Sequence, residues 1–137
     1  MDRTTGTGKY EALLARCRGL EPVPTAVAHP CEETALAGAV QAGQQGLIRP
    51  ILVGPETKIR QIAKANGISL GQLRIVDAPH SHASAAKAVE LVRQGEAELL
   101  MKGSLHSDEL LAAVVSKETG LRTGRRISHV FIMDVPT

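Results

Sequence analysis

The residues with the clearest chemical potential lie together in one short stretch, Lys102–Ser107. Lys102 supplies a fixed positive charge, and three polar side chains follow it: Ser104, His106 and Ser107. Gly103 has no side chain, so the backbone there can approach a ligand closely. A helix that begins after this stretch would point its free N–H groups at the same space, which suits a phosphate or a carboxylate. The alternative is an ordinary strand-to-helix turn with a serine cap and a solvated lysine.

A second basic segment, Gly120–His129, follows. It holds three arginines within five residues, and a serine comes shortly after: Arg122, Arg125, Arg126 and Ser128. Guanidinium groups bind phosphates and carboxylates through paired hydrogen bonds. Arginines on loops are usually solvated, so the indication that this segment binds an anion comes mainly from its position just before an expected strand.

Three other patterns predict little. Gly6–Tyr10 looks like a clipped phosphate-binding loop, but its first glycine and its hydroxyl residue are missing, and no strand precedes it. His80 and His82 could bind a metal, yet without a third ligand they are more typical of a polar turn. Cys31 could be an activated thiol, although a small buried cysteine is the commoner case. We expect no metal site.

The elements that must position these residues alternate regularly between strand and helix. Short apolar runs predict strands at Thr25–His29, Arg49–Pro55, Leu73–Asp77, Ala97–Met101 and Ile127–Met133. Helical spacing predicts helices at Tyr10–Cys17, Glu32–Gln45, Glu56–Asn66 and Ser81–Glu96, and one capped by Ser107. This alternation predicts an α/β fold, a three-layer, doubly wound, mostly parallel sheet of about five strands.

Ligands of such sheets collect at the carboxyl ends of the strands, which is where the Lys102–Ser107 stretch would lie. We divide the chain into a leader with an N-terminal helix, residues 1–22, and an α/β domain, residues 23–137. The last apolar run has no closing helix after it, and from this we expect a chain cut short within a longer protein.

Composition narrows the class of protein. The hydrophobic fraction is 43% and the aromatic fraction 1%, which is typical of a globular core built from small aliphatic residues and disfavours base stacking on nucleic acid. The net charge of +2 is too small to indicate a polyanion-binding protein. Two cysteines allow no disulfide framework, and the polar first residues predict no signal peptide. We expect a cytoplasmic protein that binds no membrane.

Four stretches together resemble the phosphate acetyl/butyryltransferase family. They are Ala28–Cys31, Gly46–Pro55, Leu100–Ser107 and Gly120–Val130. The lysine at position 102 is similar to that of the butyryl-type members and of those fused to enoyl-CoA hydratase domains. The resemblance covers nearly the whole chain after Val23.

The resemblance implies reversible transfer of an acyl group, acetyl or butyryl, between coenzyme A and inorganic phosphate. It implies no metal and no tightly bound cofactor, with coenzyme A as a substrate. Because the expected sheet has an unfinished edge and bare apolar faces, we also expect a homo-oligomer when the protein is complete. The residues that would contact phosphate are Lys102, Gly103, Ser104, His106 and Ser107. Those that would contact phosphate or coenzyme A are Arg122, Arg125, Arg126 and Ser128.

The family's members are much longer two-domain proteins, and the resemblance places their catalytic groups beyond Thr137. We therefore expect a partial enzyme that is inactive alone, the N-terminal portion of a subunit. Two alternatives stay open. One is a non-catalytic module of the same fold that binds phosphate or a small molecule. The other is a decarboxylating dehydrogenase of related fold, for which the sequence offers no metal-binding aspartate cluster.

Overall fold

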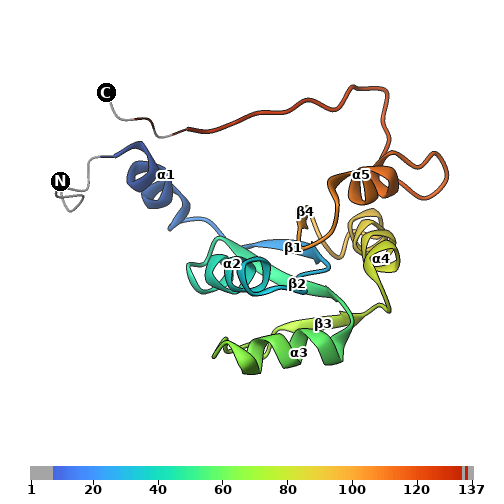
Figure 1. Ribbon diagram of the computed structural model, residues 1–137. Helices are drawn as coiled ribbons and strands as arrows, with labels where there is room; N and C mark the ends of the chain where they lie inside the picture. The colour runs from blue at the N-terminus through green and yellow to red at the C-terminus, as the bar shows by residue number, and fades with distance from the viewer. Residues whose placement is uncertain (1–7, 134, 136–137) are drawn as a thin grey trace.

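The computed structural model describes residues 8–133 and 135. Its centre is a parallel sheet of four strands in the order β3-β2-β1-β4. The strands are β1 (Val23–Ala28), β2 (Ile48–Gly54), β3 (Arg74–Asp77) and β4 (Leu99–Lys102). The helices are α1 (Lys9–Cys17), α2 (Glu33–Gln44), α3 (Glu56–Ala65), α4 (Ser81–Arg93) and α5 (Ser107–Val115). Figure 1 shows the helices around the sheet, with α1 set apart from it.

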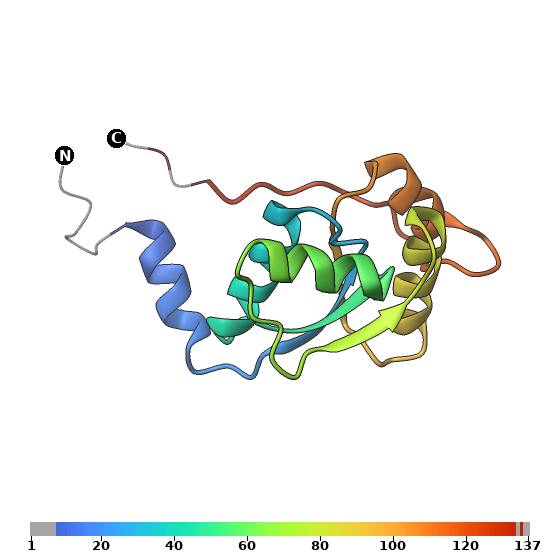
Figure 2. The ribbon, with the colours of Figure 1, turned by 60° about the horizontal axis from the view of Figure 1, so that its bottom comes forward.

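Helices cover both faces of the sheet because successive strand residues point to opposite sides. In β1, Val27 points to one side and packs in a cluster with α2 and α3, among them Leu36 and Ile59. Ala26 and Ala28 point to the other side, where α4 and α5 complete a second cluster. Figure 2 shows these layers from a second direction. The predicted three-layer α/β fold is confirmed.

The order of the strands creates a switch point beside β1. The chain builds β1, β2 and β3 outward in one direction, and then returns to place β4 on the free side of β1. All the pairings are parallel, with Ala28 opposite Lys102 at the carboxyl ends of β1 and β4. In sheets of this kind the connections diverge at the switch point and leave room there for a ligand.

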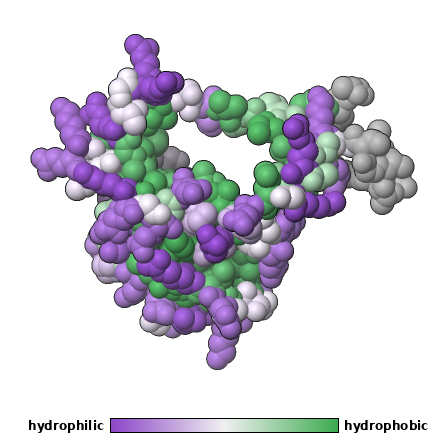
Figure 3. Space-filling view, turned by 180° about the vertical axis from the view of Figure 1, so that it is seen from behind, coloured by the Kyte–Doolittle hydropathy of each residue, from purple (hydrophilic) through white to green (hydrophobic). Residues whose placement is uncertain are grey.

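The fifth predicted strand is wrong. Residues 127–133 form no strand in the described chain, and their side chains are exposed, with 79% exposure at Val130 and 81% at Ile132. Figure 3 shows this segment standing away from the body, with an opening beneath it. An apolar extended run becomes a strand only when its backbone groups pair with another strand. The turn after α5 carries the chain away from the β4 edge, so this segment finds no such pair.

Smaller differences concern the ends of elements. The cap of α5 is His106 rather than Ser107, because the helix already includes Ser107 as its first residue. The His106 N–H donates to the Glu109 carboxylate at 3.3 Å. The predicted N-terminal helix is confirmed as α1, while residues 1–7 of the predicted leader lie outside the described residues. No helix in the described part of the chain is long and apolar enough to cross a membrane.

Candidate functional site at the β1–β4 switch point

The carboxyl end of β1 is held in an unusual backbone conformation. His29, the first residue after the strand, has a φ of 58°, in the left-handed region that residues other than glycine seldom adopt. Its N–H donates to the Val53 carbonyl of β2 at 2.7 Å. Non-glycine residues in this region often lie at functional sites, where the surrounding structure maintains them. His29 was not among the residues predicted to form the site.

The turn after β4 is joined directly to the turn after β1. The Gly103 N–H donates to the Ala28 carbonyl at 2.8 Å, and the Ser104 N–H donates to the His29 carbonyl at 2.8 Å. The Ser104 hydroxyl also donates to the His29 carbonyl at 2.8 Å, and it accepts from the Cys31 N–H at 2.9 Å. These bonds extend the sheet by one step and place both turns at one edge.

Gly103 has a structural reason that differs from the one expected. A Cβ atom at this position would lie 2.5 Å from the His29 carbonyl oxygen and closer still to that of Ala28. No side chain fits there without moving the backbone of one strand. The glycine is therefore required by the contact between β4 and β1, and it is buried rather than open to a ligand.

The hydrogen bonds of the His29 ring fix which of its nitrogens carries the proton. Nδ1 lies 3.2 Å from the Ser84 Oγ, and that hydroxyl donates its only hydrogen to the His80 carbonyl at 2.8 Å. Nδ1 must therefore be the donor to Ser84, which leaves a lone pair on Nε2 in the neutral ring. The two hydrogen-bond partners of the Ser84 hydroxyl therefore determine the tautomer of His29.

The surroundings of His29 favour its neutral form. Burial lowers the pKa of the His29 imidazole, and the positive charge of Lys58 lowers it further. The Glu109 carboxylate acts in the opposite direction, and His80 adds a smaller lowering. At neutral pH the ring is therefore uncharged, with Nε2 able to accept a hydrogen bond.

Cys31 is not an activated thiol. It is only 8% exposed, and its Sγ lies 3.7 Å from the His29 Nδ1, which is already directed at Ser84. Burial raises the pKa of the Cys31 thiol. Because the thiolate is the reactive form, the structure supports a buried structural cysteine.

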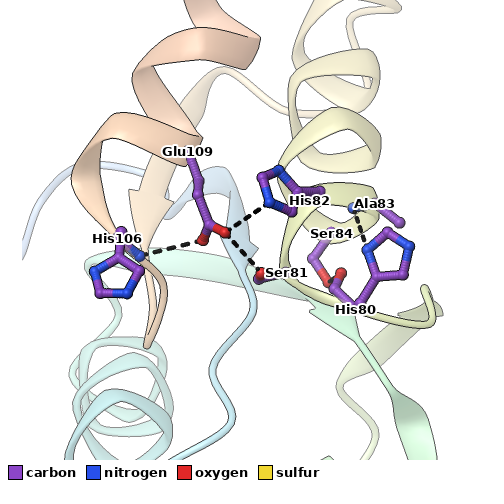
Figure 4. Close-up of polar contacts among 7 residues, drawn as sticks. All are labelled: His80, Ser81, His82, Ala83, Ser84, His106 and Glu109. Carbon is purple, nitrogen blue, oxygen red and sulfur yellow. Dashed lines mark hydrogen bonds and ion pairs between the residues drawn. The ribbon is translucent and has the colours of Figure 1, made fainter.

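A pocket of about 460 Å³ opens at this edge of the sheet, lined by His29, Ser81, Ser104, Leu105, His106 and Glu109. Figure 4 shows Glu109 reaching from α5 toward α4. Its carboxylate accepts from the Ser81 hydroxyl at 3.1 Å and from the His82 Nε2 at 3.0 Å. Glu109 thus ties the amino ends of the two helices together, and its side chain is 15% exposed. The sequence showed it only as an acidic residue in a helical first turn.

His80 and His82 have separate roles in the structure. The His80 Nδ1 accepts from the Ala83 N–H at 3.1 Å and caps α4, as Figure 4 shows. His82 instead pairs with Glu109. Within residues 8–133 and 135, no group of three His, Cys, Asp or Glu side chains is placed to hold a metal ion.

The structure brings only part of the predicted phosphate stretch into the pocket. Ser104 and His106 line it, whereas Lys102 and Ser107 are exposed and do not. The Lys102 Nζ lies 3.3 Å from the Gly103 carbonyl, at the end of β4. Lys102 therefore stands beside the pocket, where it can contact a charged part of a ligand that extends outward.

The predicted arginine segment lies elsewhere. Arg122, Arg125 and Arg126 line a separate depression of about 690 Å³, together with the last residues of α5. Ser128 is exposed beyond it. The pocket lies at the amino end of α5, so the nine residues of this helix, about 13 Å in length, separate the two regions. In this chain the arginines and the Lys102 stretch do not form one site.

The fold and the site define an α/β domain with a ligand pocket at the switch point of a parallel sheet. Comparison with known proteins is more specific. No family model matches the chain. The chain is 61% identical to a phosphate acetyltransferase of Rhizobium meliloti over 93% of its length, and 53% identical to one of Rickettsia prowazekii over 91%. It is 35% identical over 92% of its length to a phosphate butyryltransferase of Clostridium beijerinckii.

The chain spans 40%, 36% and 42% of the lengths of these three relatives. A crystal structure of a phosphotransacetylase from Streptococcus pyogenes superposes with a TM-score of 0.67 over 80% of this chain and 42% of that one. The sequence identity to that structure is 13%, so it supports the fold alone. The resemblance to the phosphate acetyl/butyryltransferase family is confirmed: the chain is homologous to a portion of proteins that bear those names.

Proposed function

We propose that this chain is part of a phosphate acyltransferase, an enzyme that reversibly transfers an acyl group between coenzyme A and inorganic phosphate. The observation that carries the proposal is the 61% identity to a phosphate acetyltransferase over 93% of the chain. The pocket at the switch point supports it, because it lies where a parallel sheet can bind a small ligand.

Acetyl is the acyl group that the comparisons favour. The relatives at 61% and 53% identity are both phosphate acetyltransferases, whereas the butyryltransferase is 35% identical. This ordering weighs against the use of Lys102 as a mark of the butyryl type. Acyl preference depends on the shape of a whole pocket, so a direct comparison of substrates is required.

In the proposed reaction the coenzyme A thiol attacks the carbonyl carbon of an acyl phosphate, and phosphate leaves as the thioester forms. Lys102, with the His106 ring and the Ser107 hydroxyl at the amino end of α5, is proposed to hold the phosphate. Gly103 and Ser104 shape this turn through their bonds to β1. Arg122, Arg125, Arg126 and Ser128 are proposed to contact phosphate or coenzyme A when another surface lies opposite them.

Several expectations stay predictions. We propose that the catalytic group lies outside this chain, so that the chain alone does not catalyse transfer. Assembly of the complete protein into a homo-oligomer, independence from a tightly bound cofactor, and a cytoplasmic location are proposals of the same kind.

The proposal is tested by assaying the full-length protein and Met1–Thr137 with acetyl- and butyryl-coenzyme A plus phosphate. We expect turnover by the full-length protein only, with acetyl preferred. In the full-length protein, Lys102→Ala should raise the Michaelis constant for phosphate about 10- to 100-fold, since a charge-assisted contact contributes about 1.5–3 kcal/mol.

Lys64→Ala is the matched control, because Lys64 is an exposed lysine in the last turn of α3, at the other edge of the sheet. An unchanged constant in Lys102→Ala would contradict the assignment of Lys102. Binding of phosphate by the full-length protein without turnover would instead support the non-catalytic module.

A further inference from the structure

Four of the side chains that line the pocket, those of His29, Ser81, Ser104 and Glu109, offer hydrogen-bond acceptors rather than donors. Its two serine hydroxyls have already used their hydrogens, that of Ser81 on Glu109 and that of Ser104 on the His29 carbonyl. The His29 Nε2 keeps an unused lone pair, because Nδ1 is the donor to Ser84. A ligand group that meets the His29, Ser81 and Ser104 side chains must therefore bring hydrogens of its own.

The charge of the pocket leads to the same conclusion. Among the described residues, the six that line it include the Glu109 carboxylate and no lysine or arginine. Asp108 adds a second acid in the first turn of α5, where both carboxylates counter the positive end of the helix dipole. A phosphate dianion placed inside would face Glu109, and the lining itself supplies no lysine or arginine to offset the repulsion, so the interior disfavours it.

We propose that this pocket binds the arm of coenzyme A that carries the amide and thiol groups, and that His29 positions the arm by accepting a hydrogen bond at Nε2. This inference rests on the proposed function, which supplies coenzyme A as the substrate. It assigns His29 a role in positioning the ligand and separates two subsites. The amide and thiol arm lies inside the pocket, and phosphate lies at its edge beside Lys102.

The assignment implies a pH dependence, because a protonated His29 loses its acceptor. The groups that face the ring come from every neighbouring element: Lys58 of α3, His80 at the cap of α4, Ser84 of α4, Glu109 of α5 and Cys31 of the turn. Burial and Lys58 together hold the pKa of His29 below its ordinary value. Affinity for the arm should therefore be constant above neutral pH and fall only in acid.

The experiment uses Met1–Thr137 and pantetheine, which has the amide and thiol groups of the arm but no phosphate. Titrations followed by ¹⁵N NMR of the histidine rings should show His29 with its proton on Nδ1 and a shift of Nε2 on adding pantetheine. Inorganic phosphate alone should leave the Nε2 signal in place. A proton on Nε2 in the free chain, or an equal response to phosphate, would overturn the inference.

His29→Asn is the sharpest variant. Asparagine tolerates the left-handed backbone, and its amide can still donate to Ser84, but it lacks the acceptor at Nε2. We expect pantetheine to bind about five- to tenfold more weakly at pH 7.5, the effect of losing one hydrogen bond. His129→Asn, an exposed histidine outside the pocket, should bind as the unaltered chain does.

Equal affinity in His29→Asn, with its fold verified by the NMR spectrum, would refute the role of His29. The proposed function fails by a different result, namely no acyl transfer by the full-length protein. Turnover combined with unchanged pantetheine binding in His29→Asn would therefore remove the inference and leave the function standing.

Discussion

The turn after β4 and the segment after α5 both contain residues suited to binding anions, but only the first is held in place by contacts within this chain. Gly103 is buried and Ser104 half-buried, and their hydrogen bonds to Ala28, His29 and Cys31 connect two strands. After α5, by contrast, the side chains of three arginines are exposed: Arg122, Arg125 and Arg126. Residues 127–133 then cross open space in Figure 3.

This difference separates residues whose positions follow from the sheet from residues that need another surface. The first region gains backbone hydrogen bonds and buried contacts that offset the entropy of ordering it. The second region has apolar side chains in water, such as Phe131 at 74% exposure. The β1–β4 turn should therefore respond to mutation through stability, and the arginine segment through binding.

The largest effect should come from Gly103→Ala. Its Cβ would overlap the carbonyls of Ala28 and His29, and backbone cannot move aside as a flexible side chain can. We expect a loss of about 3 kcal/mol in the free energy of unfolding, at the upper end for overpacking, measured by urea denaturation. Gly124→Ala in the other region, where nothing lies within 4 Å of the added atom, should change it by less than about 0.5 kcal/mol. Equal losses in the two variants would contradict the proposed difference between the two regions.

Ser104→Ala should come next. The change removes the donor to the His29 carbonyl and leaves the Cys31 N–H without its side-chain acceptor. The expected loss is about 1–2 kcal/mol in the free energy of unfolding. Ser128→Ala is the control, since Ser128 is exposed in the segment after α5. If Ser104→Ala unfolds at the same urea concentration as the unaltered chain, these bonds do not stabilise the turn.

Arg125→Ala should show the opposite behaviour. Because the side chain is exposed, we expect a change of less than about 0.5 kcal/mol in the stability of the chain. In the full-length protein, however, the Michaelis constant for coenzyme A or phosphate should rise about tenfold, from loss of a charge-assisted contact. Arg60→Ala provides a control, since this exposed arginine pairs with Glu56 on α3. Unchanged kinetics would leave the arginine segment without a binding role.

The smallest effect should be the pH dependence contributed by His29. Its pKa in the folded chain lies below the ordinary value of 6.5, so the unfolded chain binds more protons between those two values. The stability that His29 contributes is therefore full above pH 6.5 and is lost as the pH falls toward the folded pKa. Urea denaturation at several pH values should show a flatter profile in His29→Asn than in His129→Asn. Identical profiles would contradict the burial of the His29 ring.

Much of the fold could be predicted from local pattern. Apolar runs and helical spacing located four strands and five helices to within a few residues, because both periodicities report which side chains face a core. The prediction of a fifth strand was wrong because an apolar run such as residues 127–133 shows only that a segment is suited to pairing. It does not show that another strand lies beside it. The predicted cap of α5 was wrong by one residue, which is within the usual precision of helix boundaries.

The sequence by itself determined the alternating α/β order, the place of Lys102–Ser107 at the carboxyl end of a strand, and the family resemblance. Only the tertiary structure decided what surrounds those residues. It showed that Gly103 meets the backbone of β1, that Ser84 directs the proton of His29, and that α5 separates the arginines from the pocket. The reason is physical: periodicity is a property of neighbouring residues, whereas a pocket is formed by residues distant in sequence that packing brings together.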